Sequence, residues 1–239
     1  METVKHKGKR YDVEYSIVNV SELDESLRLD PRYYRSDYVE NERKIKKGKW
    51  DILKNIFEVI RVGKSPKEYS ENGKYAMVKP SNLINGVIDT KNLSRTNEEH
   101  LFKTLKYDIL VASTGSEGSD RAVAINLEDE PLYVTSELIV LRNCKINPYY
   151  VVAYLQSPIG QKELERQSAG STRQLHLTCA SLAKVKIPIP PESVQKSIVE
   201  LVLKTYEEWQ KVERSYKQAK ETLLKEFELF LSKGCDKSV

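Results

Sequence analysis

Two polar loops contain the side chains of this sequence that are best suited to contact nucleic-acid bases. One loop follows Gly170 and holds Ser171, Thr172, Arg173, Gln174 and His176, and the other holds Ser113, Thr114, Ser116 and Glu117 around Gly115. An arginine can fork onto the edge of guanine, and a glutamine can pair with adenine through two hydrogen bonds. Either loop can instead be a solvated connection between two elements. The residue types alone leave both interpretations open.

A third polar group follows a predicted strand and consists of Lys79, Ser81 and Asn82. Asn82 can instead cap a turn, which is a common role for asparagine. Basic side chains that could neutralise phosphates are Arg61, Lys64, Lys67, Arg121 and the run from Lys44 to Lys49. Such contacts would make affinity fall steeply with salt. Because runs of charge more often face water, these residues are weaker candidates than the loops.

No set of residues predicts catalysis or metal binding. The histidines His6, His100 and His176 are far apart in the sequence. The GKS sequence at 63–65 lacks the glycine that a P-loop needs five residues earlier, because position 58 is Glu. NPYY at 147–150 lacks the second proline of the adenine methyltransferase tetrapeptide. We therefore expect a non-catalytic chain that holds no metal and no cofactor.

The overall composition is that of a folded protein with a strongly solvated surface. Hydrophobic residues make up 39% of the 239 residues and charged residues 31%, with a net charge of +4. From residue 192 onward 9 basic and 9 acidic residues balance, so the positive excess lies before that point. The cysteines Cys144, Cys179 and Cys235 are scattered and odd in number, which argues against a disulfide framework. With no membrane span or secretory signal in view, we expect a cytoplasmic protein.

A single long helix is the clearest element that the sequence predicts. Between Glu192 and Lys233 the chain has no glycine and no proline. Apolar or semi-apolar positions recur there in steps of three and four, which is typical of one helical stripe. The members of this apolar stripe that we single out are Ile198, Leu201, Thr205, Trp209, Val212, Tyr216, Ala219, Leu223 and Phe227. A small domain cannot cover a helix of about 60 Å, so we expect a partner helix.

The preceding residues predict a mixed α and β domain, and the whole chain an α+β fold. Short β-rich runs lie at 75–79, 108–112, 122–125, 137–142 and 184–189. The stretch 49–62 predicts either a helix or a helix that continues into a strand, and 148–167 predicts a helix that can break at Pro158. IPIPP at 187–191 predicts a rigid extended linker. The predicted divisions are a domain at 1–190, the long helix at 191–233 and a flexible tail at 234–239.

The order of several segments resembles one half of a type I restriction–modification specificity subunit. These segments are RLDPRYY at 28–34, MVKPSNLINGVIDT at 77–90, YDILVASTGSEGS at 107–119, and the stretch from Ile146 to Pro191 that ends in IPIPP. Gln195 then opens the long helix. No single motif is specific, but their order is, and it covers nearly the whole chain.

The resemblance implies a division of labour between subunits. The domain would read half of a double-stranded DNA site, and long helices from two copies would pair antiparallel in a homodimer and fix the spacing of the half-sites. Methyltransferase subunits holding S-adenosylmethionine, and possibly a restriction subunit, would complete the complex.

Two departures from the family pattern limit this transfer. Relatives usually carry two domains and two helices, and often a basic residue where Ser113 and Thr114 stand here. A detached module of a fused methyltransferase–nuclease, or an interaction protein that binds no DNA, are the alternatives. An inhibitor that mimics DNA should be strongly acidic, which this chain is not.

Overall fold

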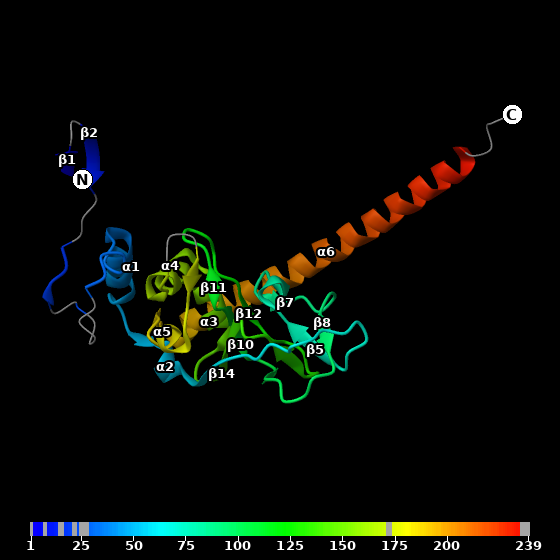
Figure 1. The fold of residues 1–239 in the computed structure, drawn as a ribbon, viewed down its shortest axis with the longest axis horizontal. Helices are drawn as coiled ribbons and strands as arrows, with labels where there is room; N and C mark the ends of the chain where they lie inside the picture. Colours follow the sequence, from blue (N-terminus) through cyan, green and yellow to red (C-terminus); the bar gives the residue numbers. More distant parts are fainter. Residues whose placement is uncertain are drawn as a thin grey trace. The chain divides into compact units, whose positions relative to one another are not determined.

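The computed structural model describes residues 2–6, 9–13, 17–20, 23, 29–170 and 174–234. The chain divides into two compact units, residues 1–195 and 196–239. Helices and short strands are mixed in the first unit, whereas the described residues of the second continue one long helix (Figure 1). This arrangement confirms the predicted α+β fold. The predicted tail at 234–239 lies outside the described residues except for Gly234.

The first unit contains many strands, most of them short, and five α-helices among the described residues. In chain order they are β1 (Glu2–His6), β2 (Lys9–Val13), α1 (Ser36–Ile45), β3 (Trp50–Ile52), α2 (Leu53–Ile56), β4 (Phe57–Val62), β5 (Tyr75–Val78), the 3-10 turn η2 (Pro80–Asn82), β6 (Leu83–Ile84), β7 (Val87–Ile88), β8 (Ser94–Thr96), β9 (Lys103–Thr104), β10 (Ile109–Ala112), β11 (Thr114–Gly115), β12 (Val123–Ile125), β13 (Leu132–Val134), β14 (Leu138–Cys144), α3 (Pro148–Gln156), α4 (Pro158–Gln167), β15 (Leu175–His176), α5 (Cys179–Ala183) and β16 (Lys186–Pro188).

A six-stranded sheet in the order β4-β14-β10-β12-β7-β6 is the centre of this unit. The pairs β4–β14, β14–β10 and β10–β12 are antiparallel, whereas β12 runs parallel to β7. All four residues of β10 are buried. Since successive side chains of a strand point to opposite faces, both faces of the sheet are covered at this strand. A second sheet in the order β8-β5-β13-β9 supplies part of that cover.

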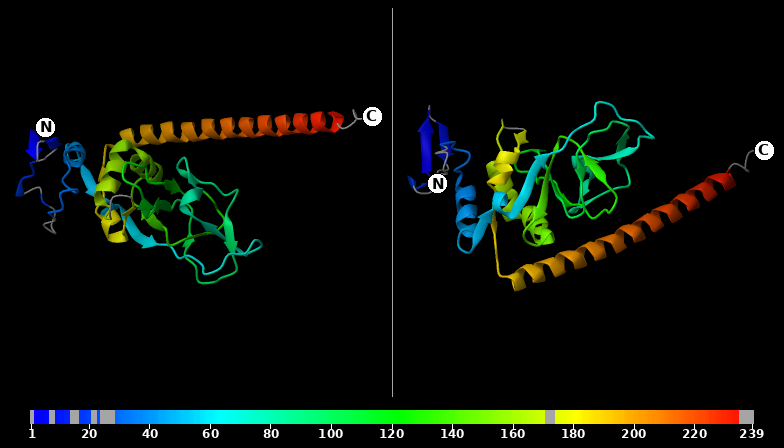
Figure 2. Two further views of the ribbon diagram at one scale, coloured as in Figure 1. Left: turned by 45° about the horizontal axis from the view of Figure 1, so that its top comes forward. Right: turned by 90° about the horizontal axis from the view of Figure 1, so that it is seen from below.

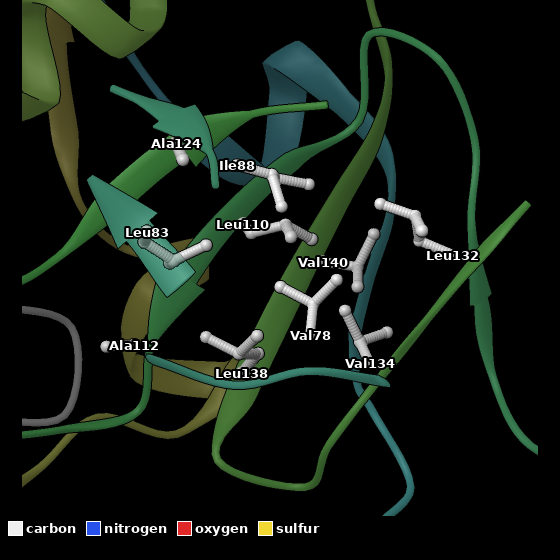
Figure 3. Packing of buried hydrophobic residues seen from close by; sticks show 10 residues of the cluster. All are labelled: Val78, Leu83, Ile88, Leu110, Ala112, Ala124, Leu132, Val134, Leu138 and Val140. Carbon is white, nitrogen blue, oxygen red and sulfur yellow. The ribbon is translucent and has the colours of Figure 1, made fainter. Parts of the chain in front are cut away.

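A cluster of buried hydrophobic residues lies where the two sheets meet. Figure 3 shows Leu110, Leu138 and Val140 of the six-stranded sheet beside Val78 of β5 and Val134 of β13. Leu110, Val140, Val78 and Val134 are fully buried. Aliphatic packing therefore fixes the position of β5 against the ends of β10 and β14, and with it the loops that leave those strands.

The helix predicted at 148–167 is broken where the sequence places Pro158. Ser157 ends α3 and its side chain accepts a hydrogen bond from the backbone N–H of Gly160 in α4. Proline at the first position of α4 removes no hydrogen bond, because the backbone N–H of any residue at that position has no partner within the helix. The stretch 49–62 contains β3 and one turn of helix before β4, so a strand precedes the predicted helix.

The long helix α6 extends over Glu192–Gly234, or 43 residues, and both views of Figure 2 show it as one continuous helix. Most members of the predicted apolar stripe are strongly exposed, with exposed fractions of 67% for Leu201, 66% for Val212 and 69% for Tyr216. Leu223 and Phe227 are each 57% exposed. Apolar side chains in such a row normally mark a surface that another element covers.

Candidate nucleic-acid interface

The two polar loops predicted to contact DNA come together in one antiparallel pair. β11 from the first loop pairs with β15 from the second, which places Thr114 opposite His176 and Gly115 opposite Leu175. The backbone N–H of Leu177 also donates to the carbonyl oxygen of Ser113 at 2.7 Å. We call residues 113–116 and 174–177 the two-loop ribbon. His176 and Ser116 are exposed, and Ser113 and Thr114 are half-buried.

The structure describes the second loop at Gly170 and from Gln174 onward. Thr172 and Arg173 lie outside the described residues, together with Ser171. Gln174 is exposed at the beginning of the ribbon. Gly170 has a φ of +148°, and a Cβ at this position would lie 2.3 Å from the carbonyl oxygen of Gln174. A glycine is therefore required where the loop leaves the preceding helix.

Several other strand ends lie beside the ribbon. The backbone N–H and the hydroxyl of Ser113 both donate to the carbonyl oxygen of Glu137, at 2.8 and 2.9 Å. The hydroxyls of Ser65 and Ser136 are 2.9 Å apart, and the N–H of Thr135 donates to the carbonyl oxygen of Val78. We call this surface, formed by residues 63–65, 79–81, 113–116, 135–137 and 174–176, the strand-end face. It carries mainly short polar side chains.

The predicted group at 79–82 is divided by the structure. Asn82 is 7% exposed, and its side-chain oxygen accepts from the backbone N–H of Lys79 at 2.9 Å. It therefore has the turn-capping role that the sequence left open, and its burial does not suit a base contact. Ser81 is exposed. The Lys79 ammonium lies 4.1 Å from the centroid of the Tyr69 ring, and Tyr69 is itself exposed.

The predicted phosphate contacts have different surroundings. Lys64 is exposed, and its ammonium donates to the carbonyl oxygen of His100 at 3.3 Å. The Arg61 guanidinium lies 4.8 Å from the centroid of the Phe102 ring, and Arg61 is exposed. Arg121, in contrast, is only 6% exposed. Its guanidinium is bonded within the protein, so the structure corrects the prediction of a phosphate contact for this residue.

Residues 117 and 118, which continue the first loop, interact with charged side chains. Glu117 accepts a hydrogen bond from the Arg35 guanidinium at 2.9 Å, and Arg32 lies 3.8 Å from the same carboxylate. The backbone N–H of Gly118 points to Glu165 of α4 at 3.4 Å. Two cations therefore offset the negative charge of Glu117. This acid is a support for the loop rather than a repulsive charge toward a phosphate backbone.

Sequence reasoning missed three members of the strand-end face, namely Ser65, Ser136 and Glu137, and also Tyr69, whose ring contacts Lys79. Ser65 follows a predicted strand closely, and Ser136 and Glu137 lie at the start of another. Their positions at strand ends were therefore a usable signal. Which strand ends adjoin each other could not be read, because β4, β10 and β14 pair across long stretches of chain.

Among the described residues, no group of three or more His, Cys, Asp or Glu side chains is placed to hold a metal ion. The helices in the described part of the chain are likewise not long and apolar enough to span a membrane. The strand-end face is polar and partly basic, and its side chains offer hydrogen-bond donors and acceptors.

Comparison with known proteins gives a match to a family model and a similar relative. A family model described as type I restriction modification DNA specificity domain matches residues 48–219. The MjaX specificity subunit of a type I restriction enzyme from Methanocaldococcus jannaschii is 30% identical over 165 residues, which are 64% of this chain and 38% of that protein. The chain thus spans well under half of the length of this relative.

Two solved structures share the fold. A chain from a type I R-M system, described for its complex assembly and conformational transition, aligns with a TM-score of 0.50 and 14% identity over 82% of this chain and 52% of its own length. The type IIG restriction endonuclease BpuSI aligns with a TM-score of 0.56 and 12% identity over 72% of this chain and 28% of its own length.

Proposed function

Because the chain belongs to the family of type I restriction modification DNA specificity domains, we propose that it reads a short DNA sequence for a separate methyltransferase. The observation that carries this proposal is the meeting of two polar loops in the two-loop ribbon. Neither loop is remarkable alone in its residue types. Joined at one end of a packed sheet, they offer donors and acceptors on a fixed scaffold, which sequence reading requires.

A two-stranded ribbon is a form that the major groove of a duplex accommodates. This groove is about 12 Å wide. In this proposal Thr114, Gln174 and His176 would contact base edges, with Arg173 contributing from the same loop. Lys64 and Lys79 would contact phosphates, and these contacts would set orientation rather than specificity.

We further propose that the apolar stripe of α6 joins this chain to a second copy and to methyltransferase subunits. Exposed leucine, valine and aromatic side chains along a helix of 43 residues would be buried by an antiparallel partner helix. A two-fold axis between identical copies would produce an inverted, interrupted target sequence. S-adenosylmethionine would be bound by the methyltransferase subunits, a restriction subunit could join the same complex, and the cytoplasm would be its location.

Titration of a fluorescent duplex of random sequence tests the basic claim. We expect binding that weakens as salt rises, since each neutralised phosphate contributes about 0.9 to the slope of log affinity against log salt. The same titration with the methyltransferase subunit present should show tighter binding. A chain that binds no duplex at low salt, alone or with that subunit, would be an interaction protein of another kind.

A detached module of a fused methyltransferase–nuclease is the second candidate, since BpuSI, a type IIG restriction endonuclease, shares the fold. In both cases this chain would recognise DNA, so binding does not separate the two. Mixing does. A separate methyltransferase that methylates DNA only when this chain is added favours the subunit, whereas methylation by this chain without added protein favours the enzyme.

A further inference from the structure

Arg121 lies under the two-loop ribbon and joins the segments that lead into both of its strands. One guanidinium nitrogen, Nη1, donates to the carbonyl oxygen of Ala112 at 2.8 Å, and Nη2 donates to the hydroxyl of Ser168 at 2.9 Å. Ala112 ends β10 directly before the first loop. Ser168 precedes Ala169, which exchanges two backbone hydrogen bonds with His176. One side chain therefore connects the supports of both strands of the ribbon.

The backbone of Arg121 is held by the same helix as its side chain. The Gln161 side chain of α4 accepts from the N–H of Arg121 at 2.6 Å and donates to its carbonyl oxygen at 3.0 Å. Gln161 and Ser168 are about two helical turns apart and so lie on one side of α4 and its last turn. Arg121 thus fixes the ribbon to a helix rather than to another loop.

Gly115 shows how closely the ribbon approaches this guanidinium. A Cβ at Gly115 would lie 3.3 Å from Cζ and Nη2 of Arg121. Contacts this short are tighter than side chains normally adopt, and the bonded guanidinium has little freedom to move aside. The backbone of β11 therefore packs directly against the Arg121 guanidinium. The position of Thr114, the neighbouring residue of β11, depends on this contact.

Burying the Arg121 cation beneath a loop costs free energy, because its charge is removed from water. Burial lowers the pKa of Arg121 to about 10, although the Glu165 carboxylate acts in the opposite direction. An apolar side chain would fill this space without the cost of removing a charge from water. What an apolar side chain cannot do is bond to Ala112 and Ser168 at once, because this needs the planar fork of a guanidinium.

We propose that Arg121 is a positioning residue for sequence reading, which holds the two-loop ribbon in register against α4 and contacts no DNA itself. This inference rests on the proposed DNA-reading function. Sequence discrimination should depend on Arg121, whereas attraction to the phosphate backbone should not.

The experiment measures discrimination and salt dependence separately for Arg121→Lys, Arg121→Gln and Ser168→Ala. The probes are a duplex library with a randomised central segment, sequenced after selection, and one duplex of random sequence titrated at several salt concentrations. For Arg121→Lys we expect unchanged affinity for the random duplex and an unchanged salt slope. Preference for the selected sequence should fall at least about tenfold, the equivalent of losing one base contact. Lys64→Gln is the matched control, because it should lower the salt slope and leave the selected sequence the same.

Three outcomes would overturn the inference. Arg121→Lys and Ser168→Ala could both select the wild-type sequence with wild-type preference, which would leave Arg121 a purely structural residue. Arg121→Lys could instead change affinity for the random duplex as Lys64→Gln does, which would make it a direct phosphate contact. If the wild-type chain selects no sequence at all, the proposed function fails and this inference with it. Thermal unfolding midpoints of all variants show whether each is folded at the temperature of the binding measurements. If Arg121→Gln does not fold, Arg121→Lys and Ser168→Ala still test the inference.

Discussion

Replacing Glu42 with glutamine should destabilise the first unit strongly at neutral pH and hardly at all in acid. Glu42 of α1 is 8% exposed and lies among three cations. Its carboxylate is 2.7 Å from the ammonium of Lys46 and 3.1 Å from that of Lys186, and it accepts a hydrogen bond from Arg166. Breaking a buried ion pair by removing one charge leaves the others without compensation.

The magnitude follows from the pKa of Glu42. Burial raises this pKa, but the charge of Lys186 and the hydrogen bonds from Lys46 and Arg166 outweigh burial and lower it from 4.5 to about 2. A difference of this size corresponds to about 3 kcal/mol of folding free energy at neutral pH. Because the folded-state pKa is the lower one, the stabilisation is complete above pH 4.5 and is lost as pH falls toward 2.

Urea unfolding at a series of pH values measures this contribution. The fluorescence of Trp50 reports on the first unit once Trp209 of α6 is replaced by phenylalanine, since the chain has 2 tryptophans. We expect Glu42→Gln to cost about 3 kcal/mol at pH 7, with the difference from wild type closing in acid. Burial raises the pKa of Glu163 and the charge of Glu42 raises it further, so Glu42→Gln also lowers the pKa of Glu163, which shares Lys186 with Glu42.

Glu117→Gln provides the matched control, because its ion pair with Arg35 is solvent-exposed. Exposed pairs contribute up to about 1 kcal/mol. Equal costs for the two substitutions at pH 7, or a Glu42→Gln difference that persists unchanged in acid, would refute the assignment of Glu42 to a buried ionic cluster.

Three further predictions concern a phosphate contact, a turn cap and the apolar stripe of α6. Lys64→Gln should weaken binding to duplexes of all sequences alike and reduce the salt slope by about 1, as measured by titration; a changed sequence preference would contradict this. Asn82→Ala should lower the unfolding free energy by about 1 kcal/mol, as measured in urea, because the N–H of Lys79 loses its acceptor; an unchanged value would refute the capping role. Leu201→Asp with Val212→Asp should abolish self-association in light scattering while Gln218→Asp, on the opposite side of α6, should not; association that survives the double change would exclude the stripe as the interface.

Elements with strong local signals could be predicted from the sequence. The helix α6 follows from a stretch without glycine or proline and from one apolar period, and its observed bounds at Glu192–Gly234 differ little from the expected ones. The break before α4 follows from Pro158. Strands such as β6, β7 and β9 contain two residues each. Segments this short have no period to detect, and they exist because neighbouring strands pair with them.

The candidate site could be predicted in part. Both loops of the two-loop ribbon were identified from residue types, but their pairing depends on contacts between distant segments that no local pattern contains. Arg121 shows the limit most clearly. A charged residue is expected at the surface. Only the hydrogen bonds of Arg121 to Ala112, Gln161 and Ser168 reveal that its side chain is buried and bonded within the protein.

The pattern of methylated adenines in cells tests the central claim, that the two-loop ribbon reads DNA sequence. The chain would be co-expressed with its methyltransferase subunit, either unchanged or with Thr114→Val and His176→Ala, and the DNA sequenced for methylation. We expect the unchanged chain to direct methylation to one interrupted motif, and the double variant, still bound to the methyltransferase, to lose or alter that motif. The same motif methylated equally well by both would contradict the account.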